Sequence, residues 1–271
     1  MPDFKSPLLG LFGLCAMISF TGATAFAEAF DQAKALSTSQ AAIGKAVGAY
    51  RFTDTRNQTI TLSSLMDKPL VISLVYTGCS DICPMVSETL ANAVAIARDG
   101  LGADSFRVAT IGFDARNDTP NRMRSYATQH GIRVDGWNFL SADAATIDAL
   151  ARDLGFTFQP SPQGFNHLSQ TTVIDTSGVV YRHIYGADFE PPVLVDALKQ
   201  LIYGQRIEMT SIEGLINRVR LFCTLYDPAS GKYRFNYSIF IGMVMGALTL
   251  GGIATVLVRA WLVQRRISRH V

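Results

Sequence analysis

The stretch Leu70-Val-Ile-Ser-Leu-Val-Tyr-Thr-Gly-Cys-Ser-Asp-Ile-Cys-Pro84 joins an apolar run to two cysteines and a proline. Residues 70–76 are nearly all apolar, which is typical of a strand buried on both faces at the centre of a sheet. Proline is tolerated in the first turn of a helix, because the N–H that it lacks would have no intrahelical partner there. The stretch therefore predicts a central strand, a turn that carries Cys79 and Cys83, and a helix over 84–97.

The start of a helix is a place where cysteines become reactive or bind metals. Its unpaired N–H groups and partial positive charge favour thiolate over thiol, and so lower the pKa of a cysteine. Cys79 and Cys83 are four residues apart, so on a helical turn their sulfurs share one face and their Cα atoms are near the separation that a disulfide accepts. Taken alone, the pair is equally a redox couple and a clamp for one soft metal ion.

Strand and helix patterns alternate around this stretch. Asp118-Thr-Pro120 has the residue types that cap a helix, and 159–169 is rich in turn residues and is expected to be a loop. This order predicts one α/β domain over 49–204, a central mixed sheet flanked by helices on the thioredoxin-like plan. The further expected strands are 51–53, 59–62, 107–113, 137–140, 171–175 and 179–185, and the further helices are 121–130, 143–154 and 191–202.

The first 27 residues have the pattern of a secretory signal peptide. Lys5 precedes a short apolar core, and Ala25-Phe-Ala27 is a cleavage motif, so cleavage is expected after Ala27. An uncleaved anchor is the weaker alternative, because the core is short for a membrane span. A lipoprotein anchor at Cys15 is disfavoured by the large residues before it. The segment 28–48 is interpreted as a lead-in to the domain.

The C-terminal part has the pattern of a membrane anchor. Residues 236–258 include an uncharged run long enough to cross a bilayer of about 30 Å, and the tail at 259–271 carries four arginines. The positive-inside rule then places the tail in the cytoplasm. The sequence thus predicts a bacterial inner-membrane protein whose domain lies in the periplasm. The segment 205–235 contains an amphipathic stretch, 212–219, that is expected to lie along the membrane surface.

Charge and cysteine usage exclude other classes of protein. The net charge of +2, with a cluster of four arginines after the expected span, gives no basic stripe for a nucleic acid. The four cysteines form no disulfide framework, because Cys15 lies in the signal and Cys223 stands alone. We interpret Cys223 as a buried or interfacial thiol. In an oxidising compartment the central pair is able to cycle as a disulfide.

Thiolates select Cu(I), zinc or iron-sulfur centres, and an added imidazole also serves Cu(II), so a third ligand would be more informative than the cysteine pair. Topology excludes His270, which follows the span. His130 ends a helix and is expected to face its C-terminal dipole, and His183 is expected to be an ordinary strand residue. His167 lies in the loop that, in a thioredoxin-like sheet, faces the cysteine turn. From spacing alone it is either a metal ligand or a solvated loop histidine.

These motifs together resemble the Sco/SenC family. The resemblance is carried by Cys79-Ser-Asp-Ile-Cys83-Pro84 after an apolar strand, by Phe113-Asp114 with Asp118-Thr-Pro120, and by the single loop histidine, and it covers about 43–204. It implies a membrane-anchored copper protein with a thioredoxin-like fold. The family binds one copper ion, as Cu(I) or Cu(II), through two cysteines and a histidine, which implies Cys79, Cys83 and His167 as ligands here.

The resemblance also implies a role and partners. Family members help to assemble the copper centre of cytochrome c oxidase subunit II, so the expected partners are that subunit or another periplasmic copper protein, a periplasmic copper donor and the membrane. This favours a metallochaperone over an enzyme. Two features depart from the family pattern. Ser80 stands where many members have proline, and the span is C-terminal rather than N-terminal.

Two other functions fit the same cysteines. In a thiol-disulfide reductase, Cys79 would attack a client disulfide and Cys83 would resolve the mixed species. A peroxidase-like protein or redox sensor would use one low-pKa cysteine. Asp114 and Asp118 have residue types suited to acid–base chemistry, but we interpret them as helix-capping and strand-end residues.

Overall fold

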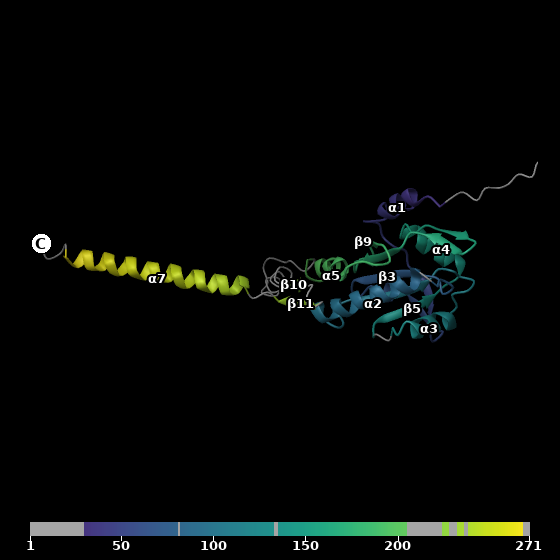
Figure 1. Ribbon diagram of the computed structural model, residues 1–271, viewed down its shortest axis with the longest axis horizontal. Coiled ribbons are helices and arrows are strands. Elements are labelled where there is room, and N and C mark those ends of the chain that lie inside the picture. The colour runs from purple at the N-terminus through teal and green to yellow at the C-terminus, as the bar shows by residue number, and fades with distance from the viewer. Residues whose placement is uncertain are drawn as a thin grey trace, which may run out of the picture. The chain divides into compact units, whose positions relative to one another are not determined.

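The protein was analysed as a computed structural model that describes residues 30–80, 82–132, 135–204, 224–227, 232–235 and 238–267. The expected signal peptide, Cys15, Cys223, His270 and the amphipathic stretch 212–219 lie outside these residues. The described part contains an α/β domain followed by a short hairpin and a long helix (Figure 1).

A seven-stranded mixed sheet forms the centre of the domain, in the strand order β2-β1-β5-β4-β3-β8-β9. The three middle strands β3, β4 and β5 are parallel, and the other pairings are antiparallel. The predicted mixed sheet is confirmed. Its strands are β1 (Arg51–Asp54), β2 (Thr59–Thr61), β3 (Leu70–Val75), β4 (Arg107–Gly112), β5 (Trp137–Ser141), β8 (Gln170–Ile174) and β9 (Val180–Tyr185).

Helices flank this sheet (Figure 1). Helix α2 packs against α5, and α3 packs against β5. A short 3₁₀ turn, η1, follows β2, and a π-helical turn, η2, follows α5. The helical elements are α1 (Gln32–Gln40), η1 (Leu62–Leu65), α2 (Ile82–Leu101), α3 (Pro120–Gln129), α4 (Ala144–Asp153), α5 (Pro191–Lys199) and η2 (Gln200–Gly204).

Strand β3 is fully buried, with all six of its residues in the core of the domain. It pairs with β4 on one side and β8 on the other, so its backbone groups are satisfied on both edges. Helix α2 follows the C-terminal end of β3 and packs back against the sheet. It buries Leu90, Ala93, Val94 and Ala97 at helical spacing. The cysteine turn between β3 and α2 is thus attached to the centre of the core, as the sequence predicts.

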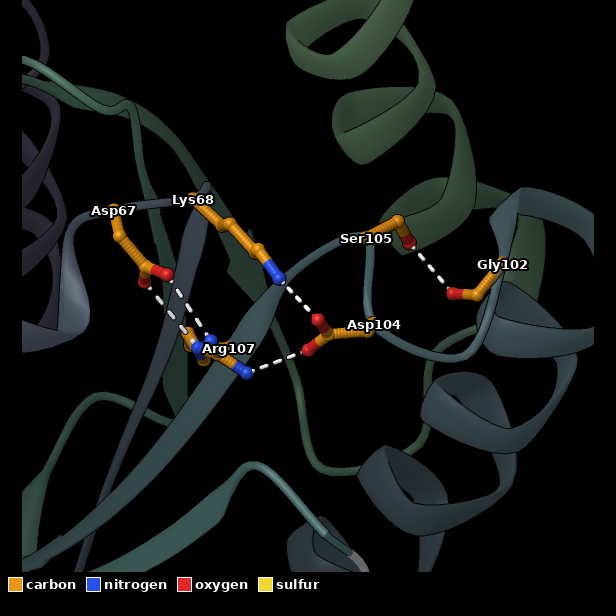
Figure 2. A network of polar contacts seen from close by, with 6 residues as sticks. All are labelled: Asp67, Lys68, Gly102, Asp104, Ser105 and Arg107. Atoms are coloured by element: carbon orange, nitrogen blue, oxygen red, sulfur yellow. Dashed lines mark hydrogen bonds and ion pairs between the residues drawn. The ribbon is translucent and has the colours of Figure 1, made fainter.

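The opposite end of these strands carries a charged network. Figure 2 shows Arg107 between the carboxylates of Asp67 and Asp104, with Lys68 on the other oxygen of Asp104. Arg107 lies 3.0 Å from Asp67 and 2.6 Å from Asp104. The network links the loops that lead into β3 and β4. Each ion pair includes an exposed carboxylate, so solvent screening limits its contribution to stability. The two cysteines lie at the other end of the strands.

A buried polar cluster fastens α1 to the edge of the sheet. The Gln170 side chain accepts from Ser39 at 2.6 Å and donates to His183 Nδ1 at 3.1 Å. Thr172 Oγ1 lies 3.0 Å from the same ring nitrogen. Because an amide N–H₂ can only donate, Nδ1 is the acceptor and the neutral imidazole carries its proton on Nε2. His183 therefore has a specific role in α1 docking that the expectation of ordinary strand packing did not include.

His130 is the C-cap residue of α3, and its ring is tilted against that of Tyr126, with centroids 4.4 Å apart. This position agrees with the predicted helix end.

Two further parts are described by themselves. Strands β10 (Thr224–Asp227) and β11 (Lys232–Phe235) form an antiparallel hairpin that the sequence did not predict. Helix α7 (Ser238–Ile267) contains Ile241–Arg259, which is long and apolar enough to cross a membrane and has no buried residue. The expected span is thus a single helix, and that helix continues past 258 into the basic tail.

The His183 cluster predicts an acid-sensitive stability. Burial lowers the pKa of His183 to about 4, whereas an unfolded histidine titrates near 6.5. Between these values the unfolded chain binds a proton that the folded chain excludes, so stability falls with decreasing pH, by up to about 1.4 kcal/mol per pH unit. Urea unfolding at pH 7 and pH 4.5 measures this loss. His183→Gln should reduce it, and His130→Gln should not; an equal loss in His183→Gln would contradict the assignment.

Candidate metal and thiol site

Cys79 and Cys83 lie where the sequence places them, between β3 and α2. The backbone turns back directly after the strand, since Cys79 N–H donates to the Tyr76 carbonyl at 3.1 Å. Helix α2 begins at Ile82, two residues before the predicted start. Cys79 therefore precedes the helix, and its Sγ accepts from Cys83 N–H at 3.3 Å. This contact brings the first sulfur over the first turn, where N–H groups lack intrahelical partners.

The two cysteines are not equivalent. Cys79 is half-buried, whereas Cys83 is 2% exposed. Burial raises the pKa of the Cys83 thiol, against the lowering contribution of a backbone hydrogen bond from Tyr76. The expectation that the helix start lowers the pKa is thus wrong for Cys83, because desolvation outweighs the favourable dipole. The accessible sulfur of the pair is that of Cys79.

His167 lies on a hairpin rather than in the predicted loop. Strands β6 (Phe158–Ser161) and β7 (Gly164–His167) pair in antiparallel register, with Phe158 opposite His167. The prolines in this segment sit at the turn and in a two-stranded ribbon, where an absent N–H is tolerated. The expectation of an irregular loop is therefore wrong, and the predicted ligand is held by regular hydrogen bonding.

Aromatic rings surround the His167 imidazole. Its centroid lies 5.4 Å from that of Phe113, 5.6 Å from Phe156 and 6.2 Å from Tyr76. This partial burial lowers the pKa of His167, opposed by a hydrogen bond to the Leu168 carbonyl. The ring is therefore neutral at pH 7. A solvated loop histidine, the alternative from spacing alone, does not describe this position.

The hydrogen bond of His167 fixes which ring nitrogen is basic. Nδ1 lies 3.2 Å from the Leu168 carbonyl oxygen. A carbonyl oxygen can only accept, so Nδ1 carries the proton and Nε2 keeps its lone pair. Histidines that bind metals commonly donate their other N–H to a carbonyl or carboxylate in this way. The arrangement suits Nε2 as a ligand atom.

Tyr76, the residue after β3, contacts both parts of the candidate site. Its ring packs edge-on against His167, and its backbone carbonyl accepts from Cys79 N–H. Burial, followed by the nearby Cys79 side chain, raises the pKa of Tyr76 to about 12. Sequence analysis treated Tyr76 only as the last residue of a strand. The apolar run before it gave no indication that Tyr76 contacts Cys79.

The structure brings the two cysteines together but does not close a ligand set of three. Among the residues that it describes, no three His, Cys, Asp or Glu side chains stand close enough to hold a metal ion. Tyr76 lies in contact with both Cys79 and His167. The ligand set Cys79, Cys83 and His167 thus remains a prediction, and its chemistry, two soft thiolates and one imidazole, is that of a copper site.

Asp118 holds the cysteine turn in place. Its Oδ1 accepts from Thr77 N–H at 2.8 Å and from the Thr77 hydroxyl at 2.7 Å, and its Oδ2 accepts from Asp114 N–H at 2.9 Å. The residue is 2% exposed. Burial raises the pKa of Asp118, and the N–H donors oppose this shift. The carboxylate therefore connects the loop after β4 to the loop after β3. We call this set of hydrogen bonds the Asp118 strap.

This position corrects the predicted role of Asp118. The N-cap of α3 is Thr119, whose Oγ1 accepts from Arg122 N–H at 3.3 Å, and Pro120 is the first helical residue. Asp114 keeps the expected strand-end role, where its carbonyl accepts from Asp118 N–H. Gly112 is required beside the strap, because a Cβ there would lie 2.4 Å from Asp118 Cβ.

Tyr126 is a second residue near the cysteines that sequence analysis did not identify. Its hydroxyl donates to the Cys83 carbonyl at 2.9 Å and lies 2.7 Å from Ser87 Oγ. The ring is buried, and burial raises the pKa of Tyr126. Helix α3 is thereby tied to the first turn of α2. Sequence analysis predicted only a helix over 121–130 and did not identify Tyr126 as part of the site.

A cysteine turn between the central strand of a mixed sheet and the following helix places the chain among thioredoxin-like proteins. The SCO1/SenC family model matches residues 38–203, which is more than half of the chain. The chain belongs to the SCO1/SenC family. A SCO1 protein homolog of Bacillus subtilis (strain 168) is 22% identical over 151 residues, which are 54% of this chain and 76% of the relative.

Solved structures share the fold. ScoI of Bradyrhizobium japonicum, a structure with copper bound, is 23% identical and superposes with a TM-score of 0.50, covering 58% of this chain and 99% of its own. BsSco, described with a disulfide switch and as a member of the Sco family of cytochrome c oxidase assembly proteins, is 18% identical with a TM-score of 0.53, covering 58% and 94%. Both likenesses support the thioredoxin-like fold.

The Asp118 strap predicts a measurable loss on substitution. Asp118→Asn keeps one acceptor oxygen for Thr77 but presents an N–H₂ group to Asp114 N–H, so one buried donor loses its acceptor. We expect a loss of about 1–3 kcal/mol in the free energy of unfolding, measured by urea denaturation, together with faster alkylation of Cys83. The control is Asp114→Asn, whose side chain binds the exposed Asn117. Equal stability of Asp118→Asn and the wild type would refute the strap.

Proposed function

We propose that this protein binds one copper ion through Cys79, Cys83 and His167 and delivers it during the assembly of cytochrome c oxidase. The observation that carries the proposal is the imidazole of His167, held with Nε2 basic on a hairpin that packs against Tyr76, whose backbone carbonyl accepts from Cys79 N–H. Membership of the SCO1/SenC family and the copper-bound relative support it.

The donor set fits copper as cargo. Thiolates are soft ligands that select Cu(I), and an added imidazole also serves Cu(II). The two cysteines would lose their protons on binding, and His167 is neutral and needs to lose none. Three protein ligands leave one side of the ion open. A client cysteine can then displace the ligands one at a time, so that copper passes without being released to water.

Membrane attachment is part of the same proposal. We infer a bacterial inner-membrane protein with its domain in the periplasm, anchored by the span within α7, because Ile241–Arg259 has the required length and composition. The client would be cytochrome c oxidase subunit II or another periplasmic copper protein, and a periplasmic donor would supply the ion. The expected signal peptide and the basic tail agree with this topology.

Copper stoichiometry tests the proposal most directly. The full-length protein in detergent should bind one Cu(I), measured by competition with a chromophoric chelator. Cys79→Ala should abolish tight binding, and His167→Ala should weaken it by about 100-fold or more, since it removes a ligand rather than an outer contact. His130→Ala, a half-buried histidine on α3, should bind as the wild type does. Equal affinity of His167→Ala and the wild type would exclude His167 as a ligand.

The asymmetry of the cysteines favours thiol-disulfide reductase activity as a second function. The accessible Cys79 sulfur would attack a client disulfide, forming a mixed disulfide and releasing one client thiolate. The buried Cys83 would then attack the Cys79 sulfur, forming the Cys79–Cys83 disulfide and releasing the second client thiol. The two functions are compatible, because client cysteines must be reduced before they accept copper.

Trapping experiments distinguish the two cysteines. In Cys83→Ser the mixed disulfide cannot be resolved, so reaction with glutathione disulfide should give a stable adduct of one glutathione on Cys79, detected by intact-mass spectrometry. Cys79→Ser should react much more slowly, because Cys83 is buried and the pKa of its thiol is raised. Faster adduct formation on Cys83 would reverse the assigned roles.

A further inference from the structure

The backbone of Cys83 is hydrogen-bonded on both sides. Its N–H donates to Cys79 Sγ at 3.3 Å, and its carbonyl accepts from the Tyr126 hydroxyl at 2.9 Å. The first contact joins the two cysteines, and the second joins Cys83 to helix α3, which packs against β5. Tyr126 thus binds the residue that directs an N–H group at the accessible sulfur of the pair.

Tyr126 is itself held from several sides. The residue is buried, and its ring is tilted against the rings of Phe139 on β5 and His130 at the end of α3. A carbonyl oxygen can only accept, so the phenolic proton lies toward Cys83. The serine is then the donor in the 2.7 Å contact between Ser87 Oγ and the phenol oxygen. One chain of hydrogen bonds therefore runs from Ser87 through the phenol to the Cys83 carbonyl.

Pro84 opposes the backbone conformation that Cys83 adopts. Helix α2 begins at Ile82, so Pro84 is its third residue and Cys83, directly before the proline, is helical. A proline ring clashes with the preceding residue in the helical region and favours an extended backbone there. An extended Cys83 would turn its carbonyl away from Tyr126. The buried hydrogen bond to that carbonyl therefore counteracts the preference that Pro84 imposes.

The direction of the Cys83 N–H depends on this conformation. Thr77 is fixed to Asp118 before the cysteine turn, and the rest of α2 packs in the core. Residues 80–83 therefore take up any backbone rotation at Cys83, which redirects its N–H. A hydrogen bond to a charged acceptor is stronger than one to a neutral acceptor, and the Cys79 sulfur carries charge as a thiolate but not in a disulfide. A well-directed N–H thus stabilises the reduced pair more than the oxidised pair.

We propose that Tyr126 is a positioning residue for the cysteine pair: by holding the Cys83 carbonyl, it keeps the Cys83 N–H on the Cys79 sulfur and favours the reduced thiols. It acts through the backbone of Cys83. The inference rests on the proposed thiol-disulfide activity and assigns to that activity a residue from a different helix. In the reduction, the Cys79–Cys83 disulfide takes two electrons and two protons from two glutathione thiols, which become glutathione disulfide.

The equilibrium with glutathione tests this role. The full-length protein in detergent is equilibrated at different ratios of glutathione to glutathione disulfide, quenched with acid and alkylated. Mass spectrometry then gives the oxidised fraction of the 79–83 pair. Tyr126→Phe keeps the ring and removes the donor. We expect the equilibrium to move about 3- to 10-fold toward the disulfide, the factor for one weakened hydrogen bond, which is about 15–30 mV.

Three further variants sharpen the comparison. The Ser87 hydroxyl, one turn after Cys83, is able to bond the same carbonyl, so Tyr126→Phe with Ser87→Ala should shift the equilibrium at least as far as Tyr126→Phe alone. Tyr50→Phe removes a hydroxyl that binds Asp153 at the end of α4, and should keep the wild-type equilibrium. Pro84→Ala removes the opposing preference, so adding Tyr126→Phe to it should shift the equilibrium by less than about 2-fold.

The proposed activity and this inference can fail separately. A wild type that forms no 79–83 disulfide in any of these buffers would exclude the activity and the role of Tyr126 with it. A wild type that titrates normally, together with an unchanged equilibrium in the Tyr126→Phe, Ser87→Ala double variant, would overturn the role alone, even if urea shows the variant to be less stable. If Tyr126→Phe does not fold, Pro84→Ala decides: it should shift the equilibrium toward the thiols, and no shift or the opposite shift would overturn the role.

Discussion

The candidate site depends on the hydrogen bonds that the carboxylate of Asp118 accepts. This carboxylate lies in the core and accepts hydrogen bonds from Thr77 and Asp114, so the loops after two adjacent parallel strands share one acceptor. Burying a carboxylate is unfavourable unless its oxygens are satisfied, and here three donors satisfy them. Thr77, at the start of the cysteine turn, is therefore fixed against the loop after β4.

Two layers of side chains build on that fixed turn. Below it, Tyr126 joins α3 to the first turn of α2 through the Cys83 carbonyl. Above it, the rings of Tyr76, Phe113 and Phe165 support the hairpin that carries His167. The rings of Tyr76 and Phe113 are buried as well, and β7 is also paired with β6. The cysteine turn and the histidine hairpin are therefore both attached to the core of the domain.

The sequence correctly predicted those elements whose signal lies in neighbouring residues. The apolar run at Leu70–Val75 and the helical spacing after Pro84 identify β3 and α2, because burial and periodicity are recorded in neighbouring residues. The hairpin was missed because Pro160, Pro162 and Gly164 are turn residues, and its pairing is stabilised by rings from elsewhere in the chain. Asp118 was assigned to a helix cap because its true partner, Thr77, is 41 residues earlier. Contacts of that kind leave no periodic signal.

Gly112 carries a consequence for how this protein can change in evolution. A β-carbon at position 112 would overlap the side chain of Asp118 and would also approach Met123 Sδ to 2.9 Å. The glycine and the aspartate, six residues apart, are therefore mutually dependent: a larger residue at 112 is compatible only with a smaller one at 118, and that exchange would leave the Thr77 N–H without its acceptor. Substitutions at positions 112 and 118 are therefore tolerated only when they occur together, and such a double change would also alter the cysteine turn.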